Sequence, residues 1–141
     1  LTSGGIIHTR ILIDLTGLRS TAAGDIIGVN GTALYCNFGQ ITTAINGTVL
    51  GGSVTCLEAP TGGDPDLDLY CAVESTGVED AAITTLDETI LVNTGDHTLG
   101  SVNTLRAMPI ADEYLNLVAG ATTDADYTAG KLLIEFWGYD A

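Results

Sequence analysis

The sequence L-D-L-Y-C-A-V-E at residues 67–74 alternates apolar with polar or small side chains, a pattern typical of a β-strand. Successive side chains of a strand point to opposite faces of a sheet, so this stretch predicts one buried and one solvated face. The expected inner face consists of Leu67, Leu69, Cys71 and Val73, and the expected outer face of Asp68, Tyr70, Ala72 and Glu74.

Two further stretches carry the same period. Residues 7–15 place five apolar or small polar side chains on one side, namely Ile7, Thr9, Ile11, Ile13 and Leu15. Residues 132–137 are largely apolar on both faces, which predicts a central strand or one covered by a neighbour.

Turn signals separate short apolar segments along the whole chain. Asn30-Gly31 and Asn46-Gly47 match the two-residue turns that join antiparallel strands. Residues 81–92 are the one place where a short helix could form, although Thr84, Thr85 and Thr89 disfavour it. The predicted strands are residues 5–16, 24–29, 32–38, 40–46, 48–58, 67–74, 89–93, 113–118 and 131–138.

Many short strands with frequent turns favour an all-β fold, either an antiparallel β-sandwich, jelly-roll-like, or a β-barrel. We expect about eight or nine strands in a single domain, residues 1–141, with residues 1–6 as an extended N-terminal arm.

The charge of the chain is one-sided. Eighteen Asp and Glu residues stand against four Lys and Arg residues, which gives a net charge of −14. Such a charge repels phosphate and anionic lipid, so we expect neither nucleic acid nor a membrane surface as a partner.

The sequence offers no pattern of residues typical of an active site. His8 and His97 are expected to be solvated surface residues, and neither sits in a nucleophile-elbow motif. Cys36, Cys56 and Cys71 are expected to be buried free thiols, with one disulfide and one free thiol as the alternative. We therefore expect no catalytic residues, no cofactor and no enzymatic activity.

Three carboxylates stand at alternate positions in a Gly- and Pro-rich loop: Asp64, Asp66 and Asp68. Calcium binds oxygen ligands from such loops, but Leu69 and Ser75 occupy the positions where the helical calcium loop needs Gly and Glu. We expect no metal here and interpret the three carboxylates as the solvated start of a strand. A looser calcium site is the alternative.

The C-terminal part of the chain resembles a known group of proteins. Residues 114–118 (Y-L-N-L-V) and 127–139 (Y-T-A-G-K-L-L-I-E-F-W-G-Y) are similar to the endings of small virion proteins of tailed phages, especially marine ones. Residues 63–69 (G-D-P-D-L-D-L), followed by Glu79-Asp80, also resemble them, so the similarity covers about the last 85 residues.

This resemblance implies a β-rich structural protein of the virion, best described as a capsid decoration, or cement, protein. It further implies a homotrimer bound to the major capsid protein on the capsid exterior, without catalytic residues. The alternatives are a head-fibre, tail or tail-fibre component that recognises a host surface, and a secreted carbohydrate-binding β-sandwich module.

The two ends of the chain are apolar, and chain ends are seldom ordered unless something holds them. We therefore expect these ends to contact neighbouring subunits. The candidate interface residues are Leu1, Ile6, Ile7, Phe136, Trp137 and Tyr139.

Overall fold

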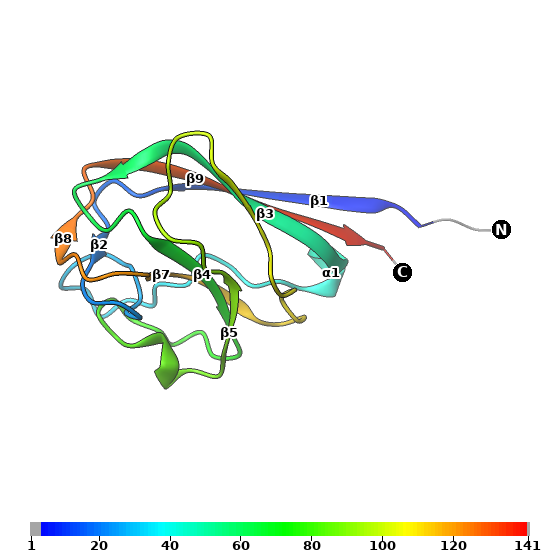
Figure 1. The fold of residues 1–141 in the computed structure, drawn as a ribbon. Helices are drawn as coiled ribbons and strands as arrows, with labels where there is room; N and C mark the ends of the chain where they lie inside the picture. Colours follow the sequence, from blue (N-terminus) through cyan, green and yellow to red (C-terminus); the bar gives the residue numbers. More distant parts are fainter. Residues whose placement is uncertain (1–3, 141) are drawn as a thin grey trace.

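A computed structural model describes residues 4–140 and shows two antiparallel sheets packed face to face (Figure 1). The four-stranded sheet has the order β1-β9-β3-β6, and the three-stranded sheet has the order β5-β4-β7. A two-stranded ribbon, β2-β8, closes one end of the sandwich. The all-β prediction is confirmed, and the two separate sheets make the fold a sandwich rather than a closed barrel.

The element bounds follow the chain in order. The strands are β1 (Ile6–Asp14), β2 (Arg19–Ser20), β3 (Thr48–Thr61), β4 (Leu67–Ala72), β5 (Glu88–Val92), β6 (Val102–Thr104), β7 (Tyr114–Ala119), β8 (Ala125–Asp126) and β9 (Ala129–Tyr139). The helical turns are α1 (Thr43–Asn46) and the 3-10 turn η1 (Ile83–Thr85). Neither turn is long or apolar enough to cross a bilayer, among the residues that the structure describes.

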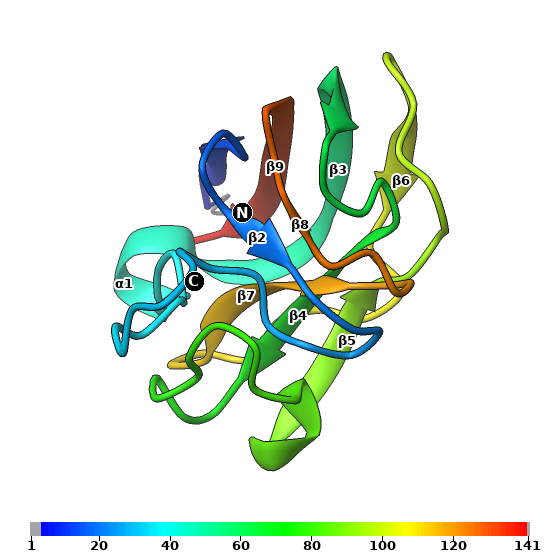
Figure 2. The same cartoon turned by 90° about the vertical axis from the view of Figure 1, so that its left-hand side faces the viewer.

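The core lies between the inner faces of the two sheets. Burial alternates strictly along β9, where Leu132, Ile134 and Phe136 are fully buried. They pack against residues of the opposite sheet such as Leu69 and Leu115. Strand β9 lies between β1 and β3, as Figure 2 shows, so the prediction of a central strand is confirmed.

Strand β4 departs from the expected pattern because both of its faces are covered. Asp68 and Ala72, predicted to be solvated, are buried. A second, smaller core of Ile26, Ile83 and Val118 packs with Tyr70 on the outer side of the three-stranded sheet. Period-2 alternation cannot reveal this cover, because loops distant in sequence provide it.

Residues 24–46 do not form the three predicted strands. They run as an irregular segment that touches the three-stranded sheet through isolated bridges, Ile26 with Val118 and Gln40 with Tyr114. This segment gains its order from those contacts rather than from a continuous ladder.

The Asn-Gly pairs make caps and turns instead of hairpins. Asn46 ends α1, and Gly47 follows with φ 68° and ψ −168°, a backbone conformation that glycine adopts readily and other residues rarely do. The Asn46 side chain accepts a hydrogen bond from the Thr42 N–H and donates one to Thr9 Oγ1, which fixes α1 beside β1. At Asn30-Gly31 only the glycine has a positive φ, so the turn is not the hairpin type.

Candidate interaction surface on the four-stranded sheet

Strand β1 ends the four-stranded sheet and has one open edge. The Asp140 N–H donates to the Gly5 carbonyl over 3.1 Å, and the Leu15 N–H donates to the Gly130 carbonyl over 2.9 Å. Because the β1–β9 register is unbroken and bonded pairs alternate in an antiparallel ladder, the odd-numbered residues of β1 bond to β9. The backbone groups that point away from β9 belong to Ile6, His8, Arg10, Leu12 and Asp14. No backbone hydrogen bond within residues 4–140 reaches them.

The face of this sheet that points away from the core is rich in exposed apolar side chains. Tyr139 lies opposite Ile6. Val102 points to the same face as Leu12, because residues paired across neighbouring strands share a face and the pairing runs Val102, Thr55, Leu133, Leu12. The exposed fractions are 65% for Ile6, 60% for Leu12, 59% for Val102, 38% for Trp137 and 39% for Tyr139. Exposed apolar residues gathered on one face, rather than scattered singly, mark interaction sites in soluble proteins. We call this face the outer face.

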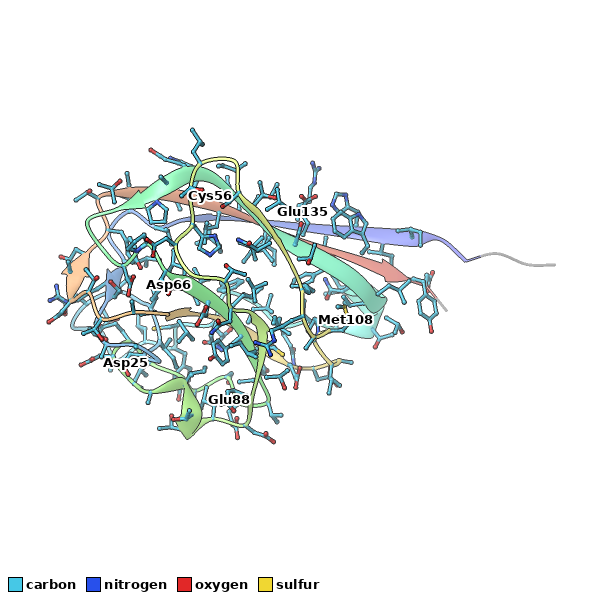
Figure 3. All side chains as sticks on the ribbon, in the orientation of Figure 1. Asp25, Cys56, Asp66, Glu88, Met108 and Glu135 are labelled. Atoms are coloured by element: carbon cyan, nitrogen blue, oxygen red, sulfur yellow. The ribbon has the colours of Figure 1, made fainter. Side chains whose placement is uncertain are left out.

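A stacked pair of rings stands on the outer face. The rings of His8 and Trp137 lie nearly parallel, with centroids 5.2 Å apart. His8 Nε2 lies 2.6 Å from Glu135 Oε2, and Figure 3 shows Glu135 on the side of the four-stranded sheet away from its partner sheet. The expectation of a surface histidine is therefore confirmed for His8, which is oriented by these two neighbours.

The outer face carries little net charge. Arg10 and Lys131 lie on it, and their acidic neighbours there are Asp14, Glu58 and Glu135. Lys131 pairs with Glu58, which raises the pKa of the lysine. With two bases against three acids, this face is nearly neutral in a chain whose net charge is −14.

A groove runs beside the C-terminal half of the β1 edge. Its volume is about 340 Å³, and it separates β1 from the irregular segment at residues 27–38. The lining is mostly apolar and includes Leu12, Ile13, Leu18, Val29, Leu34 and Tyr35. Leu34 is 71% exposed and Tyr35 61% exposed, so apolar surface continues from the strand edge onto the loop.

The predicted interface residues that the structure describes divide into three groups. Ile6, Trp137 and Tyr139 are exposed on the outer face, where a partner can reach them. Ile7 is half-buried on the inner side of β1. Phe136 is fully buried in the core, so its place among the interface candidates is wrong. Leu1 lies outside the described residues.

The acidic loop is built into the fold rather than solvated. Asp64 is 1% exposed, and its carboxylate accepts hydrogen bonds from the backbone N–H groups of Asp66 and Ala121, over 3.0 and 2.9 Å. The backbone of Asp64 also bonds to Ser20 Oγ and to the Tyr127 hydroxyl. Asp64 thus joins three segments that lie far apart in the sequence.

Asp68 is buried, and burial raises the pKa of its carboxyl group. Its Oδ2 accepts a hydrogen bond from Asn93 over 3.1 Å, while its Oδ1 has no partner within the described part of the chain. Burial, with the nearby negative charge of Asp66, raises the pKa of Asp68 to about 6. The pKa of Asp66 is also raised, mainly by burial and then by Asp64.

The raised pKa of Asp68 predicts a pH-dependent stability. The folded protein binds the proton more tightly than the unfolded chain, so this contribution is fully present below about pH 4 and is lost as the pH rises through about 6. Relative to Asp68→Asn, the free energy of unfolding of the natural chain should fall by on the order of 2–3 kcal/mol between pH 4 and pH 7. Urea unfolding of both proteins at the two pH values measures this difference. Exposed Asp87→Asn controls for the loss of one charge, and a pH-independent difference for Asp68→Asn would contradict the assignment.

His97 is not the solvated histidine that its turn position suggests. It is 2% exposed, and its Nε2 lies 2.8 Å from the Leu67 carbonyl, while Nδ1 has no partner among residues 4–140. Within the same residues, no group of three or more His, Cys, Asp or Glu side chains is arranged to hold a metal ion.

The three cysteines are free thiols, as expected. Cys56 and Cys71 are buried, and Cys36 is only half-buried. Burial raises the pKa of all three thiols. A nucleophilic cysteine needs the opposite shift, because only the thiolate reacts.

Comparison of the chain with protein-family models, with curated proteins and with solved structures found no match. The function therefore has to be argued from the surface itself. That surface has three parts which no single sequence pattern revealed: the unpaired backbone of β1, the nearly neutral outer face and the apolar groove. The period-2 pattern of residues 7–15 was the available signal, because its outward positions include Leu12, but it could not show that β1 is an edge strand.

Proposed function

We propose that this chain is a non-enzymatic structural protein of a virus particle. In this proposal it is a decoration protein that binds the major capsid protein on the outer surface of the capsid, as an oligomer, and stabilises the shell. The role, the partner and the location come from the resemblance of the C-terminal residues to small phage virion proteins, which also implies three copies.

The observation that carries the proposal is the uncovered outer face together with the open edge of β1. Ile6 and Leu12 are 65% and 60% exposed on a strand whose outward backbone groups are unbonded within the described residues. Proteins normally protect such edges with charges, prolines or covering loops, because an open edge recruits another strand. An unpaired edge that carries two exposed apolar side chains, Ile6 and Leu12, suits a protein that works by contact with neighbouring subunits.

The charge distribution agrees with an external position. The net charge of −14 would repel packaged nucleic acid, and the acids lie mainly away from the nearly neutral outer face. Contact through the outer face would therefore leave most of the negative charge toward solvent, which also keeps the assembled particles apart.

Cryo-electron microscopy of the phage particles that carry this protein tests the proposal. We expect density for the two-sheet domain on the capsid exterior, with the four-stranded sheet against capsid subunits or against a second copy. Density confined to the tail or to a fibre would instead indicate a role in host recognition. Absence of the chain from purified particles would overturn a structural role.

A second candidate, carbohydrate binding, is favoured by Trp137 and Tyr139, which expose aromatic rings on one sheet face. His8 stacks on the indole, so at most the other side of that ring is open to a sugar. Binding on a glycan array that is lost in Trp137→Ala would support this candidate over the decoration role.

A further inference from the structure

We infer that the open edge of β1 pairs with β1 of a second copy of this chain, antiparallel, so that the two four-stranded sheets become one continuous sheet. The inference concerns self-association in solution and does not depend on the capsid. It also predicts a two-fold contact, and hence a dimer, instead of the three-fold assembly implied by the resemblance.

The edge is long enough to form such a pair. Strand β1 has nine residues, and five of them present unbonded N–H and C=O groups on the open side. A two-fold contact uses the same strand on both copies, so every outward donor of one chain can meet an outward acceptor of the other. Only even-numbered residues point outward, so even-numbered residues must face one another.

One register satisfies this condition and also matches the side chains. With the two-fold axis at Thr9, Ile6 lies opposite Leu12 of the second copy, and His8 lies opposite Arg10. The two most exposed apolar residues of β1 then cover each other on the outer face. Thr9 faces its own equivalent, and Thr–Thr pairs are favourable across antiparallel strands.

The neighbouring registers are poorer. An axis at Arg10 places two arginines directly opposite each other, which is destabilising. An axis at Ile11 places Leu12 opposite Arg10 and leaves Ile6 beyond the end of the opposing strand. The Thr9 register alone pairs apolar with apolar residues at both ends of the contact.

The charge of the outer face allows a second copy to pair at this edge. The outer face holds two of the four Lys and Arg residues and only three of the eighteen acids. Two chains of net charge −14 therefore repel each other only weakly where these nearly neutral faces adjoin. Arg10 has no ion pair within the described residues, so it is available to the opposing chain.

The groove provides room beside the added strand. In the Thr9 register, Ile7 of the second copy lies opposite Ile11, next to Ile13, which lines the groove. Ile7 is half-buried on the inner side of β1, so the added strand would present apolar side chains toward the apolar lining. Burial of these groups supplies the main driving force of the association.

Sedimentation velocity of the natural chain and of Arg10→Pro tests the inference. The Arg10 N–H points to the open edge, so proline removes an edge donor without breaking the β1–β9 ladder, as is tolerated in edge strands. We expect a dimer for the natural chain and for Arg10→Ala, and a monomer for Arg10→Pro at the same concentration. Leu12→Lys, which leaves the backbone unchanged, should also be monomeric, and circular dichroism confirms that each variant is folded.

The register has its own test. Thr9 residues that face each other across a non-hydrogen-bonded pair have the Cα separation that a disulfide needs. In a Cys36→Ser background, Thr9→Cys should therefore form a covalent dimer under a mild oxidant, and Arg10→Cys should not. Efficient cross-linking of Arg10→Cys instead would overturn the Thr9 register.

A monomeric or trimeric natural chain, or a dimer unaffected by Arg10→Pro and Leu12→Lys, would overturn the inference. None of these results would bear on the position of the protein in a particle, which microscopy reports separately. Conversely, if the chain forms the dimer but is absent from virions, this inference stands and the proposed function is wrong.

Discussion

Replacement of Phe136 by Ala is expected to lower the free energy of unfolding by about 3–5 kcal/mol. Phe136 is fully buried on β9, the strand that lies between β1 and β3, so its removal leaves a cavity that the two sheets cannot close. A loss of this size is a large part of the roughly 5–15 kcal/mol that stabilises an ordinary domain. Chemical denaturation followed by circular dichroism measures it.

Trp137 provides a matched control because it is the next residue on the same strand. Its side chain is 38% exposed and stacks on His8, so Trp137→Ala should cost at most about 1–2 kcal/mol. A loss for Trp137→Ala as large as that for Phe136→Ala would mean that the outer face is covered within the monomer, and would remove the basis of the proposed contact.

Replacement of Asp64 by Ala should cost on the order of 3 kcal/mol, although the residue lies in a loop. The carboxylate accepts two backbone hydrogen bonds in a buried position, and each bond to a charged group contributes about 1.5–3 kcal/mol. Removal of Asp64 leaves the N–H groups of Asp66 and Ala121 without these acceptors. Thermal unfolding measures the loss, with exposed Asp87→Ala as the control.

The same experiment distinguishes a structural carboxylate from a calcium ligand. Because the Asp64 oxygens are used by backbone donors, we expect excess EDTA or added calcium to leave the melting temperature of the natural chain unchanged. A fall in melting temperature on adding EDTA, absent from Asp64→Ala, would restore the calcium interpretation.

Two kinds of position in this protein look alike in the sequence and differ in the fold. Ile6 and Phe136 were both expected at an interface because both are apolar and near a chain end. The first is 65% exposed and the second is fully buried. Position in the chain does not separate them, because the face to which a side chain points depends on the register between β1 and β9.

The histidines show the same limit. His8 was expected on the surface from strand alternation, and this local rule held because β1 has solvent on its outer side. His97 was expected on the surface from its turn position, yet it is buried against the Leu67 carbonyl. A turn is solvated only if no other segment packs on it. The sequence around His97 does not indicate whether another segment does so.

The sequence by itself determined the strands with strong periodicity. The alternation along residues 7–15 and 67–74 and the two-sided apolar run near the C-terminus predicted β1, β4 and β9, because a strand must bury one or both faces to be stable. Composition similarly determined that the protein is acidic, with a net charge of −14.

Only the tertiary structure decided which strand became an edge, which carboxylates were buried and where apolar surface remained uncovered. Residues 24–46 illustrate the reason. Their β-forming residues and Asn-Gly turns favour hairpins locally, but bridges to β7 and to residues 78 and 82, and the cap at Gly47, fix another path. These outcomes depend on contacts between residues far apart in the chain. The pairing order that leaves β1 open is such a contact pattern, and the proposed self-association depends on it.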